Sequence, residues 1–222
     1  MTTLTRRPNH RWAVVDFNGV LGRHPTHEHW SALAKASVWG GSTGELQQAF
    51  WAQRAVYDAG KITEREFWRP LAGPGAALDQ VADQDAAMWL EIDPQVLDAL
   101  NNAVDDGIRL VMLSNAPRPV ADLITAAPWS GLFAHLLYSC DLGLNKPARG
   151  AYWAALAAAG NPDPADVLFV DDRIDNIASA RQMGLLTHHY QGHPENLAAN
   201  LHLHAGRNLQ RHHRLNIVSD PT

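Results

Sequence analysis

Apolar residues gather in three short runs along the chain, and each run ends in polar residues. The runs are WAVVDF at residues 12–17, IRLVMLSN at 108–115 and VLFVDD at 167–172. None of them alternates apolar and polar positions, which is typical of strands that are buried on both faces of a parallel sheet. We therefore expect three core strands in such a sheet.

Segments with helical periodicity lie between and after these strands. Helices are expected at residues 93–107, 148–160 and 175–184, where apolar residues recur at helical spacing. Alternating strands and helices favour right-handed crossover connections. The sequence thus predicts an α/β fold with a doubly wound, Rossmann-like parallel sheet, in which ligands bind beyond the carboxyl ends of the strands.

A stretch of about seventy residues after the first strand departs from this alternation and has only helical patterns. Within it, Thr63 followed three residues later by Glu66 forms a capping box, which predicts the start of a helix. We expect this stretch to be an inserted helical cap. The expected division is a core of residues 10–21 and 93–200, a cap of residues 22–92 and a loosely attached C-terminal tail of residues 201–222.

Composition narrows the class of protein. The 222 residues are 46% hydrophobic and 18% charged, as in ordinary globular proteins. A formal net charge of -5 gives no positive field for nucleic acid, and no apolar stretch is long enough to span a bilayer. We expect neither nucleic acid nor membrane as a partner, and the oligomeric state is open. The single cysteine, Cys140, excludes an internal disulfide and favours a cytoplasmic location.

Polar residues stand at the carboxyl end of each predicted strand. Asp16 closes the first run, Ser114 and Asn115 the second, and Asp171 and Asp172 the third. Because parallel strands end at the same edge of a sheet, these carboxylates should lie close together, which is costly unless they share a cation. Oxygen ligands of this kind suit Mg²⁺, which also bridges to phosphate.

Lys146 adds a positive charge that could neutralise both the carboxylates and a bound phosphoryl group. A carboxylate nucleophile, a metal, a lysine and a hydroxyl donor together suit phosphoryl transfer through an aspartyl-phosphate. Simpler explanations exist for each residue taken alone, since aspartates also cap helices and most lysines are exposed loop or surface residues.

Four segments resemble, in order, the four motifs of the haloacid dehalogenase (HAD) superfamily of hydrolases. VVDFNGV is similar to motif I, LVMLSN to motif II, NKP to motif III and LFVDDRIDN to motif IV. The position of the expected cap and the segment DAGKITEREFW, residues 58–68, further resemble the subgroup with a helical cap after motif I. That subgroup includes sugar-phosphate phosphatases and the phosphatase domain of epoxide hydrolases.

The resemblance implies the activity of a phosphatase-type hydrolase on a small phosphorylated metabolite. Asp16 would be the nucleophile, and Lys146 would orient it. Ser114 and Lys146 would hold the phosphoryl oxygens, with Asn115 also among the substrate-binding candidates. The implied catalytic residues are Asp16, Asn18, Ser114 and Lys146.

The resemblance also implies a Mg²⁺ cofactor. Asp172 would bind the metal directly, with Asp171 assisting and Asn176 supporting the metal shell. The carboxylate of Asp16 and the backbone carbonyl of Asn18 would complete the protein's ligands.

Asn18 departs from the pattern of the family, which has a second aspartate there as general acid and base. Asn18 keeps the backbone ligand but cannot donate the proton, and such assistance is worth about 10²–10⁴-fold. A leaving group that needs little protonation could compensate, as could a proton from His24 or His27. The alternatives are an attenuated phosphatase, a hydrolase of a carbon–halogen or other non-phosphoester bond, and a non-catalytic ligand-binding or scaffold protein.

The expected cap is rich in tryptophan, with Trp30, Trp39, Trp51 and Trp68. Most tryptophans are core anchors, although some of these could face a substrate. Arg54 could meet a second anionic group of that substrate, whereas a solvated charge on a helix is the commoner situation.

Overall fold

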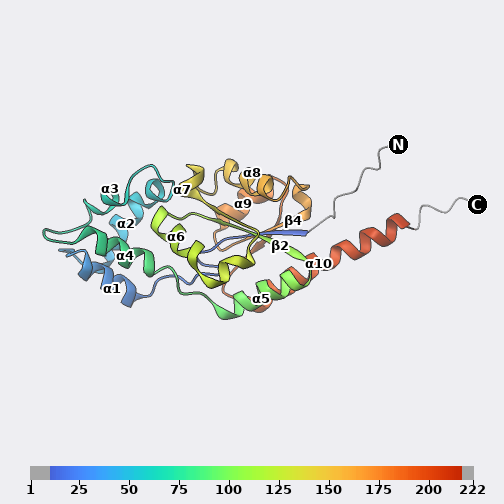
Figure 1. Ribbon diagram of the computed structural model, residues 1–222, viewed down its shortest axis with the longest axis horizontal. Helices are drawn as coiled ribbons and strands as arrows, with labels where there is room; N and C mark the ends of the chain where they lie inside the picture. Colours follow the sequence, from blue (N-terminus) through green and yellow to red (C-terminus); the bar gives the residue numbers. More distant parts are fainter. Residues whose placement is uncertain (1–10, 217–222) are drawn as a thin grey trace, which may run out of the picture.

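Five parallel strands form the centre of the molecule, in the order β3-β2-β1-β4-β5 (Figure 1). The strands are β1 (Arg11–Val15), β2 (Ile108–Ser114), β3 (His135–Tyr138), β4 (Val167–Asp171) and β5 (Leu186–His189). The computed structural model describes residues 11–216, with side chains through residue 206. The expected α/β class with a doubly wound parallel sheet is confirmed.

The side chains of β1 alternate between two separate apolar cores. Ala13 and Val15 belong to the core on one face of the sheet, and Trp12 and Val14 belong to the core on the other. The first face is covered by α5 (Pro94–Asp105), α6 (Arg118–Ala126) and α10 (Pro194–Asn216), the second by α8 (Arg149–Ala158) and α9 (Ile174–Gln182) (Figure 1). Burial on both faces explains why this strand is a continuous apolar run.

The two edge strands, β3 and β5, have no counterpart among the strands expected from the sequence. Each has four residues, HLLY and LTHH, and most of these are only half-buried. They form strands because they pair with β2 and β4, respectively. Tertiary pairing of this kind overrides a weak local signal.

The helices expected at 93–107, 148–160 and 175–184 correspond to α5, α8 and α9. The side chain of Asp93 caps α5 by accepting a hydrogen bond from the backbone N–H of Gln95 at 2.9 Å. Gly107 follows α5 with a φ of 86°, a left-handed conformation that favours glycine and stops the helix.

Residues 22–92 form a helical insertion between β1 and β2, at the left of Figure 1. Its helices are α1 (His27–Ala36), α2 (Thr43–Asp58), α3 (Glu64–Trp68) and α4 (Leu78–Ala87). The expected capping box of Thr63 and Glu66 is present at the start of α3. Gly22 and Ile92 pair in an isolated antiparallel bridge, so the chain leaves and rejoins the core at neighbouring points. The function of this insertion as a cap stays a prediction.

Helix α10 crosses the boundary that was expected at residue 201. Leu201 is 1% exposed, and His204 donates a hydrogen bond from Nε2 to the backbone oxygen of Trp12 at 3.1 Å. These residues therefore belong to a packed helix, not to a loose tail; polar residues on its exposed face hid the apolar positions. Residue 10 of the expected core lies outside the described residues, and so do residues 217–222 of the expected tail. Within residues 11–216, no helix is both long enough and apolar enough to cross a bilayer.

Candidate active site

A cavity of about 650 Å³ lies between the carboxyl ends of the central strands and the helical insertion. Its lining comes from the residues after β1, β2 and β4, the loop before α8, the start of α9, and α2 and Trp89 of the insertion. Strands β1 and β4 are neighbours at the point where the strand order reverses. Doubly wound sheets bind their ligands at this point.

Asp16 follows β1 and is 5% exposed. Its Oδ1 accepts a hydrogen bond from the backbone N–H of Phe17 at 2.7 Å and lies 2.7 Å from Lys146 Nζ. None of the described residues donates a hydrogen bond to Asp16 Oδ2. Burial raises the pKa of Asp16, while the neighbouring lysine opposes this shift by favouring the ionised carboxylate.

Asp171, at the end of β4, is fully buried, and both of its carboxylate oxygens are engaged. Oδ2 lies 2.8 Å from Lys146 Nζ. Oδ1 accepts hydrogen bonds from Asn176 Nδ2 and from the backbone N–H of Arg173, both at 2.9 Å. Burial lowers the pKa of Lys146, but Asp16 and Asp171 outweigh it, so the pKa is raised. Asp171 is therefore placed to hold the lysine ammonium.

Asp16, Asp171 and Asp172 form a cluster whose possible ligand atoms lie within 4.8 Å of one another. The side chain of Asp172 is 22% exposed and its Oδ2 lies 3.4 Å from His24 Nε2. Gly19 makes room for this carboxylate, because a Cβ at that position would collide with it. Asp16 and Asp172 thus offer oxygen atoms of the kind that Mg²⁺ prefers.

Four polar atoms around these carboxylates are buried and have no hydrogen-bond partner within the described part of the chain. They are Asn18 Oδ1, Ser114 Oγ, Asn145 Oδ1 and Asn176 Oδ1. Buried polar atoms in folded proteins are nearly always hydrogen-bonded. Amide oxygens accept hydrogen bonds, so this set fits a site that holds donors such as the water ligands of a hydrated metal ion.

Ser114 and Asn115 differ in their placement. Ser114 is 1% exposed and is not among the described residues that line the cavity, whereas Asn115 lines it. The side chain of Asn115 donates from Nδ2 to the backbone oxygen of Lys146 at 3.0 Å and accepts from its backbone N–H at 2.8 Å. Asn115 therefore positions the loop that carries Lys146. This role leaves no signal in the sequence, because the pairing joins segments 31 residues apart.

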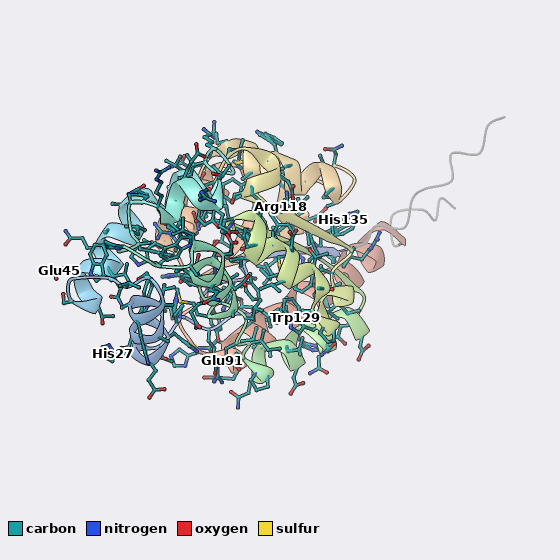
Figure 2. All side chains as sticks on the ribbon, turned by 60° about the vertical axis from the view of Figure 1, so that its left-hand side comes forward. His27, Glu45, Glu91, Arg118, Trp129 and His135 are labelled. Carbon is teal, nitrogen blue, oxygen red and sulfur yellow. The ribbon has the colours of Figure 1, made fainter. Side chains whose placement is uncertain are left out.

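Of the two histidines considered as proton sources, the structure brings only His24 to the cavity. Its pKa is raised, chiefly by a hydrogen bond with Asp172. His27 is exposed on the outer side of the insertion, as Figure 2 shows. Asn18 lines the cavity, as its position in the motif implied.

The tryptophans of the insertion have different environments. Trp30 and Trp68 are buried in the apolar core, and Trp39 packs against that core. Trp51 is 54% exposed and lines the cavity. Trp89, which the sequence analysis did not single out, also lines it, with its ring centroid 5.9 Å from that of Trp51. No sequence signal marked Trp89, because its orientation depends on the packing of the insertion.

Arg54 of α2 is 3% exposed although it is charged. Its Nε lies 2.5 Å from Asp58 Oδ1, and its Nη1 lies 3.2 Å from Asp85 Oδ1. The guanidinium also lies 4.8 Å from the ring centroid of Phe50 and 5.1 Å from that of Trp89. Because two carboxylates already balance its charge, the expectation that Arg54 meets a second anionic group of a substrate is not supported.

A comparison with families of known proteins agrees with these features of the site. The features are the aspartates at the strand ends, the lysine between them and the helical insertion. The sequence model of the family of haloacid dehalogenase-like hydrolases matches residues 10–184 of this chain. The chain belongs to this family. The family expected from the four motifs is therefore confirmed, and with it the assignment as a hydrolase-type enzyme.

Two curated relatives are similar in sequence to this HAD-like hydrolase over part of their length. A drimenol cyclase from Aspergillus calidoustus is 27% identical over 184 residues, which cover 79% of this chain and 33% of the relative. Haloacid dehalogenase-like hydrolase domain-containing protein 3 from Xenopus laevis is 28% identical over 148 residues, 60% of each chain. The chain thus spans less than two thirds of the length of both relatives.

The fold is also found in a HAD family enzyme from Bacteroides thetaiotaomicron, solved in complex with magnesium and inorganic phosphate. The two structures superpose with a TM-score of 0.69 at 19% identity, over 82% of this chain and 96% of the other. At this level of identity the likeness shows a shared fold.

Proposed function

We propose that this HAD-like hydrolase is a Mg²⁺-dependent phosphatase that acts on a small phosphorylated metabolite through Asp16. The observation that carries the proposal is the pairing of Asp16 Oδ1 with Lys146 Nζ at 2.7 Å, beside Asp172 in a cavity of about 650 Å³, while no described residue donates to Asp16 Oδ2. A cavity of this size suits a small molecule. The Bacteroides enzyme with magnesium and phosphate bound supports the same chemistry.

In the proposed reaction, Asp16 Oδ2 attacks the phosphorus atom of the ester. A bond forms between this oxygen and phosphorus while the bond to the alcohol oxygen breaks, and the alcohol leaves with the electron pair and takes up a proton. Water then attacks the aspartyl-phosphate, which releases inorganic phosphate and restores the carboxylate. Lys146 neutralises charge on the phosphoryl oxygens and holds Asp16 in place.

The carboxylates of Asp16 and Asp172 and the backbone carbonyl of Asn18 are the groups that would hold Mg²⁺. When bound, the metal supplies positive charge next to the phosphoryl oxygens. Asp171 supports the site indirectly, since its oxygens hold Lys146 and Asn176. Ser114 Oγ, at the end of β2, has no partner among the described residues, and we keep it as the proposed hydroxyl donor to a phosphoryl oxygen.

Replacement of the nucleophile tests this proposal most directly. With an aryl phosphate as substrate, wild-type turnover should require Mg²⁺, and Asp16→Asn should lower kcat by roughly 10³-fold or more. Asp83→Asn is the matched control, because it makes the same chemical change at an exposed position of α4. Metal-dependent turnover that survives in Asp16→Asn would show that the proposal is wrong.

The Asn18→Asp variant tests why the general acid is missing. If the natural protein is an attenuated phosphatase, this variant should raise kcat on alkyl phosphates by about 10²–10⁴-fold. Aryl phosphates should gain less, because their leaving groups need little protonation. Lower activity of Asn18→Asp on both classes would instead favour a non-phosphoester substrate, and halide release without phosphate would identify it.

We also propose that the protein acts in the cytoplasm and does not bind nucleic acid. The single Cys140 and the net charge of -5 support these two points. Fractionation of cells that express the chain, and a gel-shift assay with duplex DNA at low salt, would check them.

A further inference from the structure

The helical insertion contributes one wall of the cavity, and the chemistry of this wall is distinct from that of the strand ends. We call it the insertion wall; its residues are Trp51, Arg54, Ala55 and Asp58 of α2, together with Trp89. None of these residues belongs to the four motifs around the nucleophile. The insertion wall is therefore separate from the proposed phosphoryl chemistry. It is placed to contact the part of a substrate that lies away from the phosphate group.

Two hydrogen bonds fix the end of α2 on the core. Ser139 Oγ donates to the backbone oxygen of Asp58 at 2.5 Å. Asn145 Nδ2 donates to the backbone oxygen of Ala55 at 2.6 Å. Asn145 precedes Lys146 in the chain, so the insertion wall is held next to the loop that carries the lysine.

This attachment leaves two acceptor oxygens unused on residues that line the cavity. Asp58 is 8% exposed, and its Oδ1 is paired with Arg54, but no described residue donates to its Oδ2. Asp58 Oδ2 is not among the buried unpaired atoms, so it is accessible from the cavity, whereas Asn145 Oδ1 is buried without a partner among the described residues. A buried acceptor that is left unpaired is costly, so a bound molecule that donates a hydrogen bond to Asn145 Oδ1 would relieve this cost and could donate to Asp58 Oδ2 as well.

The charges of the wall disfavour a second anion. Arg54 is shared between Asp58 and Asp85, two carboxylates against one guanidinium. The other arginine that lines the cavity, Arg173, lies 2.8 Å from Asp175. A carboxylate or second phosphate of a substrate would therefore meet Asp58 without an unpaired arginine to offset the repulsion.

We propose that the insertion wall selects phosphate monoesters whose alcohol part carries hydrogen-bond donors, an amine or hydroxyls, and no second anionic group. Asp58 Oδ2 and Asn145 Oδ1 accept the hydrogen bonds, and the exposed ring of Trp51 packs against the carbon skeleton. This inference rests on the proposed phosphatase function and adds the class of leaving group. In this proposal the strand ends bind the phosphate group, and the insertion wall binds the alcohol part of the substrate.

Three phosphates with the same six-carbon length test the proposal on the wild-type enzyme: glucosamine 6-phosphate, glucose 6-phosphate and 6-phosphogluconate. They carry an amine, only neutral hydroxyls, and a carboxylate, respectively. We expect kcat/KM to fall in this order, with the amine favoured over the carboxylate by about tenfold to a hundredfold, the size of a charge-assisted hydrogen bond.

The Asp58→Asn variant should reduce this ratio of amine to carboxylate substrate by about tenfold, because an amide lacks the negative charge. Asp58→Glu keeps the charge and should restore part of the ratio. Asp83→Asn, on the exposed side of α4, is the matched control and should keep the wild-type ratio. Circular dichroism spectra show whether each variant is folded.

The outcomes separate this inference from the proposed function. Equal rates on all three substrates, a preference for the carboxylate, or an Asp58→Asn variant with the wild-type ratio would each overturn the inference, while Asp16-dependent phosphate release would leave the function standing. No phosphate release from any substrate would overturn both. Should Asp58→Asn fail to fold, the order of the three substrates on the wild-type enzyme decides by itself.

Discussion

Among the residues that the structure describes, two buried cations each lie between two carboxylates. In the core, Lys146 lies between Asp16 and Asp171, and we call this group the core triad. In the insertion, Arg54 lies between Asp58 and Asp85, and we call this group the insertion triad. Both triads carry one more negative than positive charge when fully ionised, yet their surroundings differ.

The core triad lies beside a further carboxylate, Asp172, and near oxygens that are unpaired among the described residues and fit a hydrated metal ion. The insertion triad is enclosed by aromatic rings, and Trp89 Nε1 donates to Asp85 at 2.9 Å. Lysine is a compact charge on a flexible stem, whereas the guanidinium of Arg54 is a planar fork that stacks on rings. The same balance of charge thus occurs in two settings, an open one beside the proposed nucleophile and an enclosed one in the proposed binding wall.

Removal of each cation should have the largest effect, on stability. Lys146→Met and Arg54→Met each leave two buried carboxylates without a positively charged partner, which should lower the free energy of unfolding by about 3–5 kcal/mol. Mg²⁺ should recover part of this loss in Lys146→Met, because the metal can replace the missing charge, but not in Arg54→Met. Urea unfolding with and without Mg²⁺ measures both effects, and equal recovery in the two variants would contradict the distinction between the triads.

Exchange of the two cation types should have the next largest effect, on catalysis. Lys146→Arg keeps the charge but changes its geometry at the nucleophile, so kcat on an aryl phosphate should fall by about 10²–10³-fold. Arg54→Lys should lower the same kcat by less than about tenfold, since the insertion triad does not touch the phosphoryl group. Steady-state kinetics on the two variants provide the measurement. A greater loss in Arg54→Lys would mean that the insertion triad takes part in the chemistry.

The smallest expected effect concerns pH and substrate selection. Burial raises the pKa of Asp58 to about 6; Arg54 opposes this shift and Asp85 adds to it. Above this pH the carboxylate is ionised and can attract an amine, whereas below it the carboxyl group is neutral. The ratio of kcat/KM for glucosamine 6-phosphate over 6-phosphogluconate should therefore fall several-fold as the pH decreases through about 6.

Titration of the substrate's phosphate group is common to both substrates and cancels in this ratio. The Asp58→Asn variant is the control, and its ratio should change little over the same range of pH. A wild-type ratio that stays constant from pH 5 to pH 8 would show that Asp58 does not discriminate by its charge.

The two carboxylates of the core triad could be predicted from local patterns in the sequence. Asp16 and Asp171 end apolar runs, and strands of a parallel sheet end at one edge, so their meeting follows from the fold class. Lys146 needed the resemblance to a known motif, since a lysine in a loop has no local signal. The clamp that Asn115 forms on the backbone of Lys146 depends on how two loops meet, and sequence patterns do not contain that information.

The insertion triad was only partly accessible from the sequence. Arg54 and Asp58 stand four residues apart in a helical segment, a spacing that predicts an ion pair and could have been recognised. Asp85 lies 31 residues from Arg54, and its approach depends on the packing of the helices. The edge strands β3 and β5 and the end of α10 escaped prediction for the same reason, since tertiary contacts fix each of them.

The hydrogen bond from Asn145 to the backbone oxygen of Ala55 joins the insertion to the loop before α8. The insertion cannot swing away from the core without breaking it, and its donor is the chain neighbour of Lys146. A movement of the insertion away from the core would therefore disturb the loop that carries Lys146, whose Nζ lies 2.7 Å from Asp16 Oδ1. The position of the insertion and the position of the lysine are thus linked through two neighbouring residues of one loop.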